Sequence, residues 1–288
     1  MHRMTPRAST LSSIAVAFAF VLGLCAPAFA QQRPLVTQDP EAIGAGNVLV
    51  EAGVDYGNGI YFPASGLEGN LWRVPMLGVV VGVGSMAEIQ LTGGYKRLSI
   101  TDRREAPLAD EVAPGDTTSA VEDLVIGTKL RLLAEREGVP AVALRIATRL
   151  PNASEASGIA LDTTEFYASF LVGKTIRSTR VALNAGLGIL PDPVNASRQN
   201  DVLTYGLSLV QAVEERFDVV AEVNGRLNTR GDEAPVGTES QGALRGGARF
   251  TIGSARLDAG LVVGLTSRDP NIGFTAGFTY MFKAFNVQ

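Results

Sequence analysis

Charged side chains fall in the same alternating phase in several stretches, always an even number of positions apart, and they are the residues best able to act on a solute. In 123–133 and 141–150 they alternate with large aliphatic residues. Groups of both signs at this spacing share one face of a strand, where they can pair with one another or select a solute by its charge. The candidate lumen-lining residues are Lys129, Arg131, Arg145, Arg149, Arg226, Arg245, Arg249, Asp123, Glu165, Glu222 and Asp258.

Short turns between neighbouring strands predict partners for some of these groups. One turn would place Arg249 opposite Asp258, which is a favourable pair. Another would place Lys129 opposite Arg145, and this pair of like charges needs a nearby acid or a bound anion. The groups are either structural ion pairs that brace a solvated lumen or a charged constriction that selects solutes by sign, and the sequence leaves both readings open.

The chain offers little material for catalysis. Its only cysteine is Cys25 and its only histidine is His2, and both fall in the first 30 residues. The remainder therefore has no thiol nucleophile and no imidazole for a serine–histidine pair or a zinc site. An acid-only site remains an alternative, but nothing in the spacing of the acids marks a pair. We expect no enzyme, no catalytic residue, no metal and no cofactor.

Residues 1–30 resemble a secretory signal peptide. Arg3 and Arg7 precede an apolar stretch at 11–24, and Ala28-Phe29-Ala30 is a typical cleavage site. Its removal takes away basic residues and none of the 29 acidic ones, so the exported chain is acidic, which argues against a nucleic-acid partner. We expect residues 31–46 to hang in the periplasm or to fold back as a plug, and residues 47–288 to form one domain.

Hydrophobic residues in that domain alternate with a period of two, which predicts about twelve strands. The weakest is the second, because Pro75 removes a backbone donor and requires a bulge or a later start. The predicted strands lie near 47–56, 71–83, 87–98, 122–133, 141–150, 164–175, 180–190, 202–213, 217–227, 242–252, 255–266 and 272–282.

The connections alternate in length, as they do in outer-membrane barrels with long extracellular loops and short periplasmic turns. Twelve strands would enclose too wide a space for apolar packing, so the apolar face must look outward to lipid. The fold class is therefore all-β, a single antiparallel transmembrane barrel in the outer membrane of a Gram-negative cell. Predicted long loops lie at 57–70, 99–121, 151–163, 191–201, 228–241 and 267–271, and short turns at 84–86, 134–140, 176–179, 214–216 and 253–254.

Two features predict partners of such a barrel. In the last strand a polar residue is followed by a glycine two positions on and by aromatic residues five and seven positions on, which resembles the signal read by the barrel assembly machinery. Its residues are Thr275, Gly277, Tyr280 and Phe282. The acidic loop 99–121 would be solvated at the cell surface, where divalent ions could bridge it to lipopolysaccharide.

Several motifs also resemble one family, the outer-membrane barrels labelled "putative MetA-pathway of phenol degradation". They are the run 33–40 (RPLVTQDP), the run 72–75 (WRVP), the run 122–129 (EDLVIGTK) and the run 149–151 (RLP). The resemblance implies a porin-like transport barrel that takes up small molecules, with hydrophobic or aromatic compounds as suspected solutes. The alternative is a non-conducting scaffold or surface-binding barrel.

Overall fold

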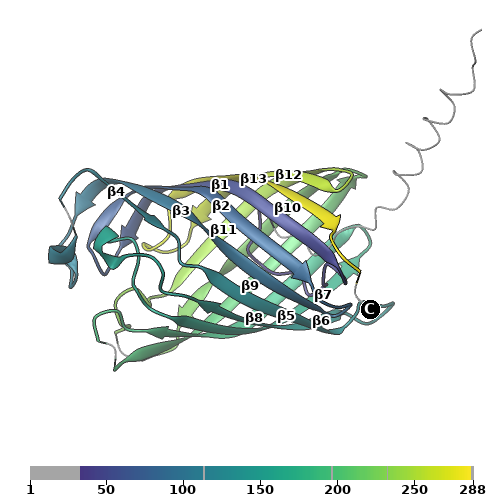
Figure 1. The fold of residues 1–288 in the computed structure, drawn as a ribbon, viewed down its shortest axis with the longest axis horizontal. Coiled ribbons are helices and arrows are strands. Elements are labelled where there is room, and N and C mark those ends of the chain that lie inside the picture. The colour runs from purple at the N-terminus through teal and green to yellow at the C-terminus, as the bar shows by residue number, and fades with distance from the viewer. Residues whose placement is uncertain (1–32, 113, 196, 232, 287–288) are drawn as a thin grey trace, which may run out of the picture.

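The computed structural model describes residues 33–112, 114–195, 197–231 and 233–286. Within these ranges the chain forms antiparallel strands that tilt around a common axis and close into a barrel, because β1 pairs with β13 and β2 with β3 (Figure 1). The strands are β1 (Asn47–Phe62), β2 (Leu67–Gly82), β3 (Ala87–Arg103), β4 (Thr117–Val121), β5 (Val125–Leu133), β6 (Ala141–Arg149), β7 (Glu165–Ile176), β8 (Thr179–Pro191), β9 (Gln199–Glu214), β10 (Phe217–Asn228), β11 (Gln241–Ile252), β12 (Ala255–Gly264) and β13 (Ile272–Lys283).

The barrel has twelve strand positions, as the sequence predicted, because β4 and β5 share one of them. Both pair with β3: residues 117–121 lie beside 95–99, towards its extracellular end, and residues 125–130 lie beside 87–92, towards its periplasmic end. The backbone N–H of Glu122 donates to the carbonyl of Gly94 at 2.8 Å, so the ladder continues through the gap between β4 and β5. The predicted bulge at Pro75 is also present, since the β2–β3 register shifts between Arg73 and Met76.

The side chains alternate as a membrane barrel requires. Large apolar residues such as Phe170 and Leu261 are about 60% exposed on the outer wall, where lipid would cover them. Polar residues such as Lys129 and Glu88 are almost fully buried on the inner wall. No helix among the described residues is long and apolar enough to cross a membrane.

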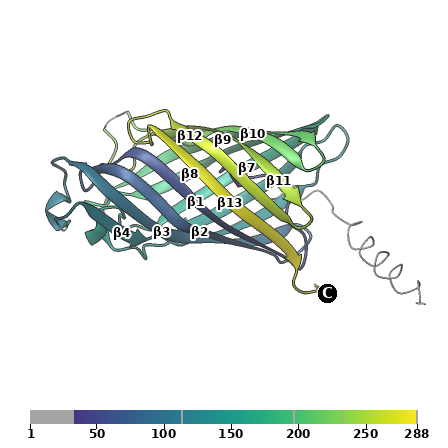
Figure 2. The ribbon, with the colours of Figure 1, turned by 90° about the horizontal axis from the view of Figure 1, so that it is seen from above.

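Two predicted long loops are shorter than expected. Strands β1 and β2 run on to Phe62 and from Leu67, so a four-residue turn replaces the predicted loop 57–70. Strand β3 continues to Arg103, and β4 occupies the end of the predicted loop 99–121. These strands project beyond the rest of the barrel at the end opposite the C-terminus (Figure 2). The signal peptide predicted at 1–30 lies outside the described residues.

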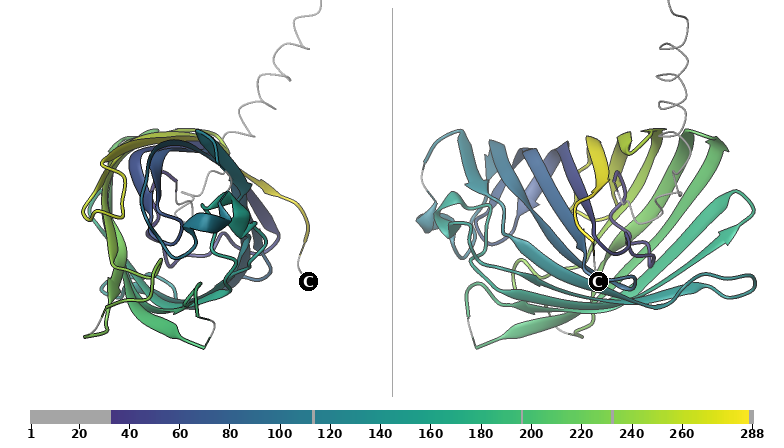
Figure 3. Two further views of the ribbon diagram at one scale, coloured as in Figure 1. Left: turned by 90° about the vertical axis from the view of Figure 1, so that its left-hand side faces the viewer. Right: turned by 45° about the vertical axis from the view of Figure 1, so that its right-hand side comes forward.

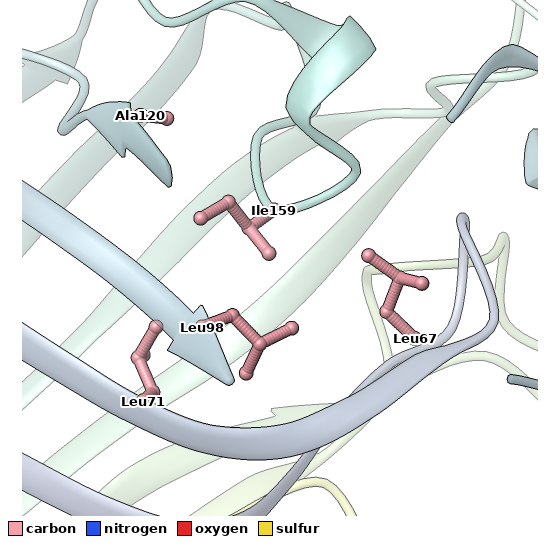
Figure 4. Close-up of a cluster of buried hydrophobic side chains, with 5 residues drawn as sticks. All are labelled: Leu67, Leu71, Leu98, Ala120 and Ile159. Carbon is pink, nitrogen blue, oxygen red and sulfur yellow. The ribbon is translucent and has the colours of Figure 1, made fainter. Parts of the chain in front are cut away.

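The inner wall is not polar throughout, which corrects the expectation of a wholly aqueous lumen. At the extracellular end Leu67, Leu71 and Leu98 point inward and form a buried cluster with Ala120 (Figure 4). Ile159 joins this cluster from the connection between β6 and β7, which therefore folds into the mouth of the barrel. Burial of this apolar surface closes part of the mouth over β2–β4.

Candidate functional site

The most informative feature is the segment before the first strand. Residues 33–46 form no helix or strand and run inside the barrel, where the darkest purple trace enters the ring of strands (Figure 3). Their partners include residues of β1, β3, β5, β8, β10 and β13, so the segment crosses the lumen and contacts much of its wall. We call it the N-terminal plug. Of the two arrangements that the sequence left open, the structure shows the inserted one.

Arg33 fastens the start of the plug. Its Nη2 donates to Thr275 Oγ1 at 2.9 Å and to the carbonyl of Ala276 at 2.8 Å, and its Nε lies 3.5 Å from Asp258 Oδ1. Its own carbonyl accepts a hydrogen bond from Arg249 Nε at 2.8 Å. Charge-assisted bonds of this kind are roughly twice as strong as neutral ones, so Arg33 is firmly held.

The wall makes room for the Arg33 side chain with two glycines. Gly53 of β1 and Gly277 of β13 are direct partners in the sheet, and a methyl group on either would overlap the guanidinium. Two other glycines of the wall make room for the plug in the same way. A methyl group added at Gly206 would lie 2.6 Å from Thr37 Oγ1, and one added at Gly173 would lie 2.8 Å from Pro40 Cγ. Glycine at these positions allows the backbone of the wall and the plug to approach each other closely.

Gly277→Ala should loosen the plug and raise the frequency of opening in single-channel recordings, because the added methyl group displaces the guanidinium of Arg33. Gly246→Ala is the control, since its methyl group would meet only one carbonyl oxygen at 4.0 Å. If the two residues act together, Gly277→Ala has no further effect in an Arg33→Ala background. Equal effects in both backgrounds would contradict the view that Gly277 acts by making room for the side chain of Arg33.

Wall side chains satisfy the backbone of the plug. The carboxylate of Glu222 accepts the N–H groups of Val36 and Thr37 at 2.9 and 2.7 Å. Asn184 both donates to the carbonyl of Gln38 and accepts from its N–H, at 2.8 and 2.7 Å. These bonds replace the water that an irregular buried segment would otherwise need.

The middle of the plug is held by charge. Asp39 accepts two hydrogen bonds from the guanidinium of Arg180, at 2.7 and 2.8 Å, and its carbonyl accepts one from Lys129 Nζ at 2.8 Å. Lys129 also pairs with Glu88 at 3.0 Å, and the exposed fractions of these two side chains are 0% and 1%. Burial makes this pair costly to break.

The turn between β5 and β6 closes on the plug from the periplasmic side. The N–H of Glu135 donates to Glu41 Oε1 at 3.1 Å, and its carboxylate accepts the N–H of Thr175 at 2.8 Å and lies 3.2 Å from Lys174 Nζ. Burial alone would raise the pKa of Glu135, but the bonds from Thr175 and Lys174 outweigh it and hold that pKa below its ordinary value. The carboxylate therefore stays ionised and keeps the turn against the plug.

Two cavities remain beside the plug. The first cavity, of about 400 Å³, is lined by residues of β1–β3, β5 and β6, together with Arg245 of β11 and Thr275 of β13. The second cavity, of about 480 Å³, lies against β6–β12. Both are lined by Val36 and Gln38 of the plug and by Arg145 and Arg245 of the wall. Ten charged side chains line the first cavity, which are Arg33, Arg73, Lys96, Arg145, Arg149, Arg245, Glu51, Asp55, Glu122 and Asp123. Those of the second are Arg145, Arg226, Arg245 and Asp269, so both cavities carry an excess of positive charge.

The structure divides the candidate lumen-lining residues into two groups. One group contacts the plug directly and consists of Lys129, Arg131, Arg249, Glu222 and Asp258. The other lines the cavities or braces residues that do, and consists of Asp123, Arg145, Arg149, Glu165, Arg226 and Arg245. The register places Lys129 opposite Arg145 and Arg249 opposite Asp258, in agreement with the predicted turns.

The last strand carries the candidate assembly signal on both of its faces. Tyr280 and Phe282 are exposed on the outer wall, with ring centroids 5.8 Å apart, whereas Thr275 and Gly277 face inward against Arg33. The two inward residues therefore have a structural role in the folded barrel, and reading of the signal by the assembly machinery stays a prediction.

The sequence interpretation missed the residues that hold the plug from β8. Arg180 and Asn184 alternate with apolar residues in the same phase as the inner wall, so the period of two could have identified them as lumenal. Arg33 and Asp39 stood within the motif at 33–40, but no spacing pattern connects them with partners more than a hundred residues away.

Comparison with known proteins agrees with this architecture. The family model described as "Putative MetA-pathway of phenol degradation" matches residues 31–282. No curated protein matches the chain.

Several solved structures share the barrel. The COG4313 outer membrane channel from Pseudomonas putida F1 is similar with a TM-score of 0.63 at 14% identity, over 85% of this chain and 98% of that one. The translocator domain of the autotransporter NalP from Neisseria meningitidis has a TM-score of 0.50 at 12% identity, over 95% and 97% of the two chains. The NanC porin has a TM-score of 0.50 at 6% identity, over 83% and 100%. The fold is that of outer-membrane β-barrels.

Proposed function

We infer that this chain, which belongs to the family described as "Putative MetA-pathway of phenol degradation", is an outer-membrane channel or facilitator for the passive uptake of small molecules. The observation that carries the inference is the pair of cavities on either side of the plug, both lined by Arg145 and Arg245. Cavities of this size suit small organic molecules. The similar structures support the proposal, since two of them are named as a channel and a porin.

The solutes we propose have apolar or aromatic bodies, as the family description suggests. Inward-facing Leu171, Val262 and the ring of Tyr167 line the second cavity and offer them apolar contact. No group of three or more histidine, cysteine, aspartate or glutamate side chains in the described part of the chain could hold a metal ion. Many of the lumenal charges are engaged with the plug or with one another, and the proposal assigns none of them to catalysis.

Arg145→Glu tests whether the cavities form part of a conducting path. The substitution replaces a positive charge that faces both cavities with a negative one, so the reversal potential under a salt gradient should shift towards cation selectivity. Arg216→Glu is the control, because Arg216 lies in the exposed turn between β9 and β10 and lines neither cavity. An unchanged reversal potential in Arg145→Glu would remove Arg145 from any conducting path.

A non-conducting scaffold is the second candidate, and the plug is the observation that favours it. The plug is bonded to many strands of the barrel, as a permanent closure would be. Planar bilayer recordings of the purified chain distinguish the two functions. Discrete openings support the channel, whereas a silent bilayer for the intact chain and for a chain without its plug supports the scaffold.

A further inference from the structure

The charges around Arg145 do not balance. Lys129 lies directly opposite Arg145 in the register of β5 and β6, and Glu88 is the acid that pairs with Lys129, at 3.0 Å. The position opposite Arg145 on the other side, in β7, is Ser169. The carboxylate of Glu88 therefore balances Lys129, and the positive charge of Arg145 is left over on this part of the wall.

Arg145 itself makes one hydrogen bond to a described residue, in which its Nε donates to Gln90 Oε1 at 2.8 Å. No carboxylate lies within 4.0 Å of its guanidinium in the described ranges, whereas the wall arginines Arg131, Arg149, Arg180 and Arg245 each have at least one. Arg145 lines both cavities. An arginine that is withdrawn from bulk water and has spare donors is a favourable partner for a carboxylate, which it can bind in a bidentate way.

The second cavity is the side on which an anion would meet least repulsion. Its only acidic lining residue is Asp269, whose carboxylate accepts hydrogen bonds from the N–H of Gly242 and the hydroxyl of Thr266. The first cavity, by contrast, holds four carboxylates. An anion attracted by Arg145 should therefore lie in the second cavity.

The surroundings of Arg145 there also suit an apolar body. Tyr167, Ser169 and Leu171 follow one another along the inward face of β7 and line the second cavity with it. On β8 the residue opposite Ser169 is Gly186, which has no side chain to project into the lumen at this point. A flat ring beside Tyr167 and Leu171 would bury apolar surface while its acid group reached Arg145.

We propose that the second cavity binds a small organic carboxylate with a flat apolar body, and that the guanidinium of Arg145 holds its acid group. The proposal rests on the proposed function, because it names the class of solute that the lumen takes. It also explains how the like-charge pair of Lys129 and Arg145 is balanced when a solute is present.

The test uses benzoate and its uncharged analogue benzamide as probes of the full exported chain in detergent, with binding measured by isothermal titration calorimetry. Benzoate should bind more tightly than benzamide, and Arg145→Gln should weaken benzoate binding at least about tenfold while leaving benzamide unaffected, because a charge-assisted bidentate contact is lost. Arg145→Lys should retain part of the preference, since it keeps the charge without the fork geometry.

Arg226→Gln is the matched control. Arg226 lines the same cavity, but its Nε and Nη2 already donate to the carbonyls of Glu239 and Gly237, at 3.0 and 2.8 Å. Its substitution removes one positive charge from the same cavity but no donor free for a ligand's acid group, so it should weaken benzoate binding far less than Arg145→Gln does. Folding of each variant is verified by the faster electrophoretic migration of unboiled samples.

The proposal is overturned if benzoate and benzamide bind the unmodified chain equally, or if Arg145→Gln binds benzoate as tightly as the unmodified chain does. Neither result depends on conduction, so either would leave the proposed channel standing. A bilayer that stays silent even without the plug would instead count against the channel and leave the measured affinities as they are.

Discussion

Deletion of residues 33–44 should convert a nearly closed barrel into an open one, with single-channel conductance several-fold above that of the intact chain. The plug crosses the lumen and is bonded to opposite sides of the wall, from Thr275 of β13 to Arg180 of β8. Its removal leaves the charged groups of the inner wall to water, which can solvate them, and an open pore of hydrated charges conducts ions.

The deletion keeps the predicted signal peptide and the whole of β1, so the pairing of β1 with β13 is left in place. A folded barrel is verified by its slower migration after boiling. The control is a chain in which residues 33–44 are replaced by a glycine–serine segment of equal length, which should also conduct because it lacks the side chains that bind the wall. Conductance that stays at the level of the intact chain in both variants would show that the plug is not what closes the lumen.

Lys129→Met should lower the free energy of unfolding by about 3–5 kcal/mol, because it leaves the buried carboxylate of Glu88 without its cation. The substitution also removes the bond from Lys129 Nζ to the carbonyl of Asp39 in the plug. Guanidinium-induced unfolding of the barrel in lipid vesicles measures the loss. The comparison is Arg131→Met, whose ion pair with Glu41 is partly exposed and should contribute only about 0–1 kcal/mol.

A second substitution separates charge from packing in this prediction. Glu88→Gln in the Lys129→Met chain removes the stranded carboxylate, while its amide oxygen can still accept the N–H of Ile43. The double variant should therefore recover much of the lost stability. A double variant as unstable as Lys129→Met alone would mean that the loss comes from the side-chain volume and the plug contact rather than from the unpaired charge.

The strands could be predicted from the sequence because in each strand the alternation of apolar and polar residues reflects lipid on one side and the lumen on the other. In β12, Leu257, Leu261 and Val263 alternate with Arg256 and Asp258, and the structure places the first set outside and the second inside. The missing backbone donor of Pro75 predicted either a bulge or a later start of the strand, and the structure has the bulge. Local pattern suffices where lipid lies on one side of a strand and the lumen on the other.

The plug could not be predicted in the same way. Residues 33–46 have no periodicity, because their backbone bonds go to side chains of the wall rather than to a neighbouring strand. The apolar cluster around Leu98 escaped prediction for a related reason. In the sequence its inward-facing leucines cannot be told from the lipid-facing residues of a membrane strand. Their burial depends on Ile159, which a connection distant in sequence brings into the extracellular end of the barrel.

The position of Arg33 bears on how the molecule is put together. Its side chain lies across Gly53 and Gly277, which face each other where the first and last strands join. Arg33 precedes every strand in the chain, yet half of its binding site, at Gly277, is supplied by the last strand. The full set of contacts of Arg33 can therefore form only once the first and last strands have paired, so closure of the ring and seating of the leading segment stabilise each other.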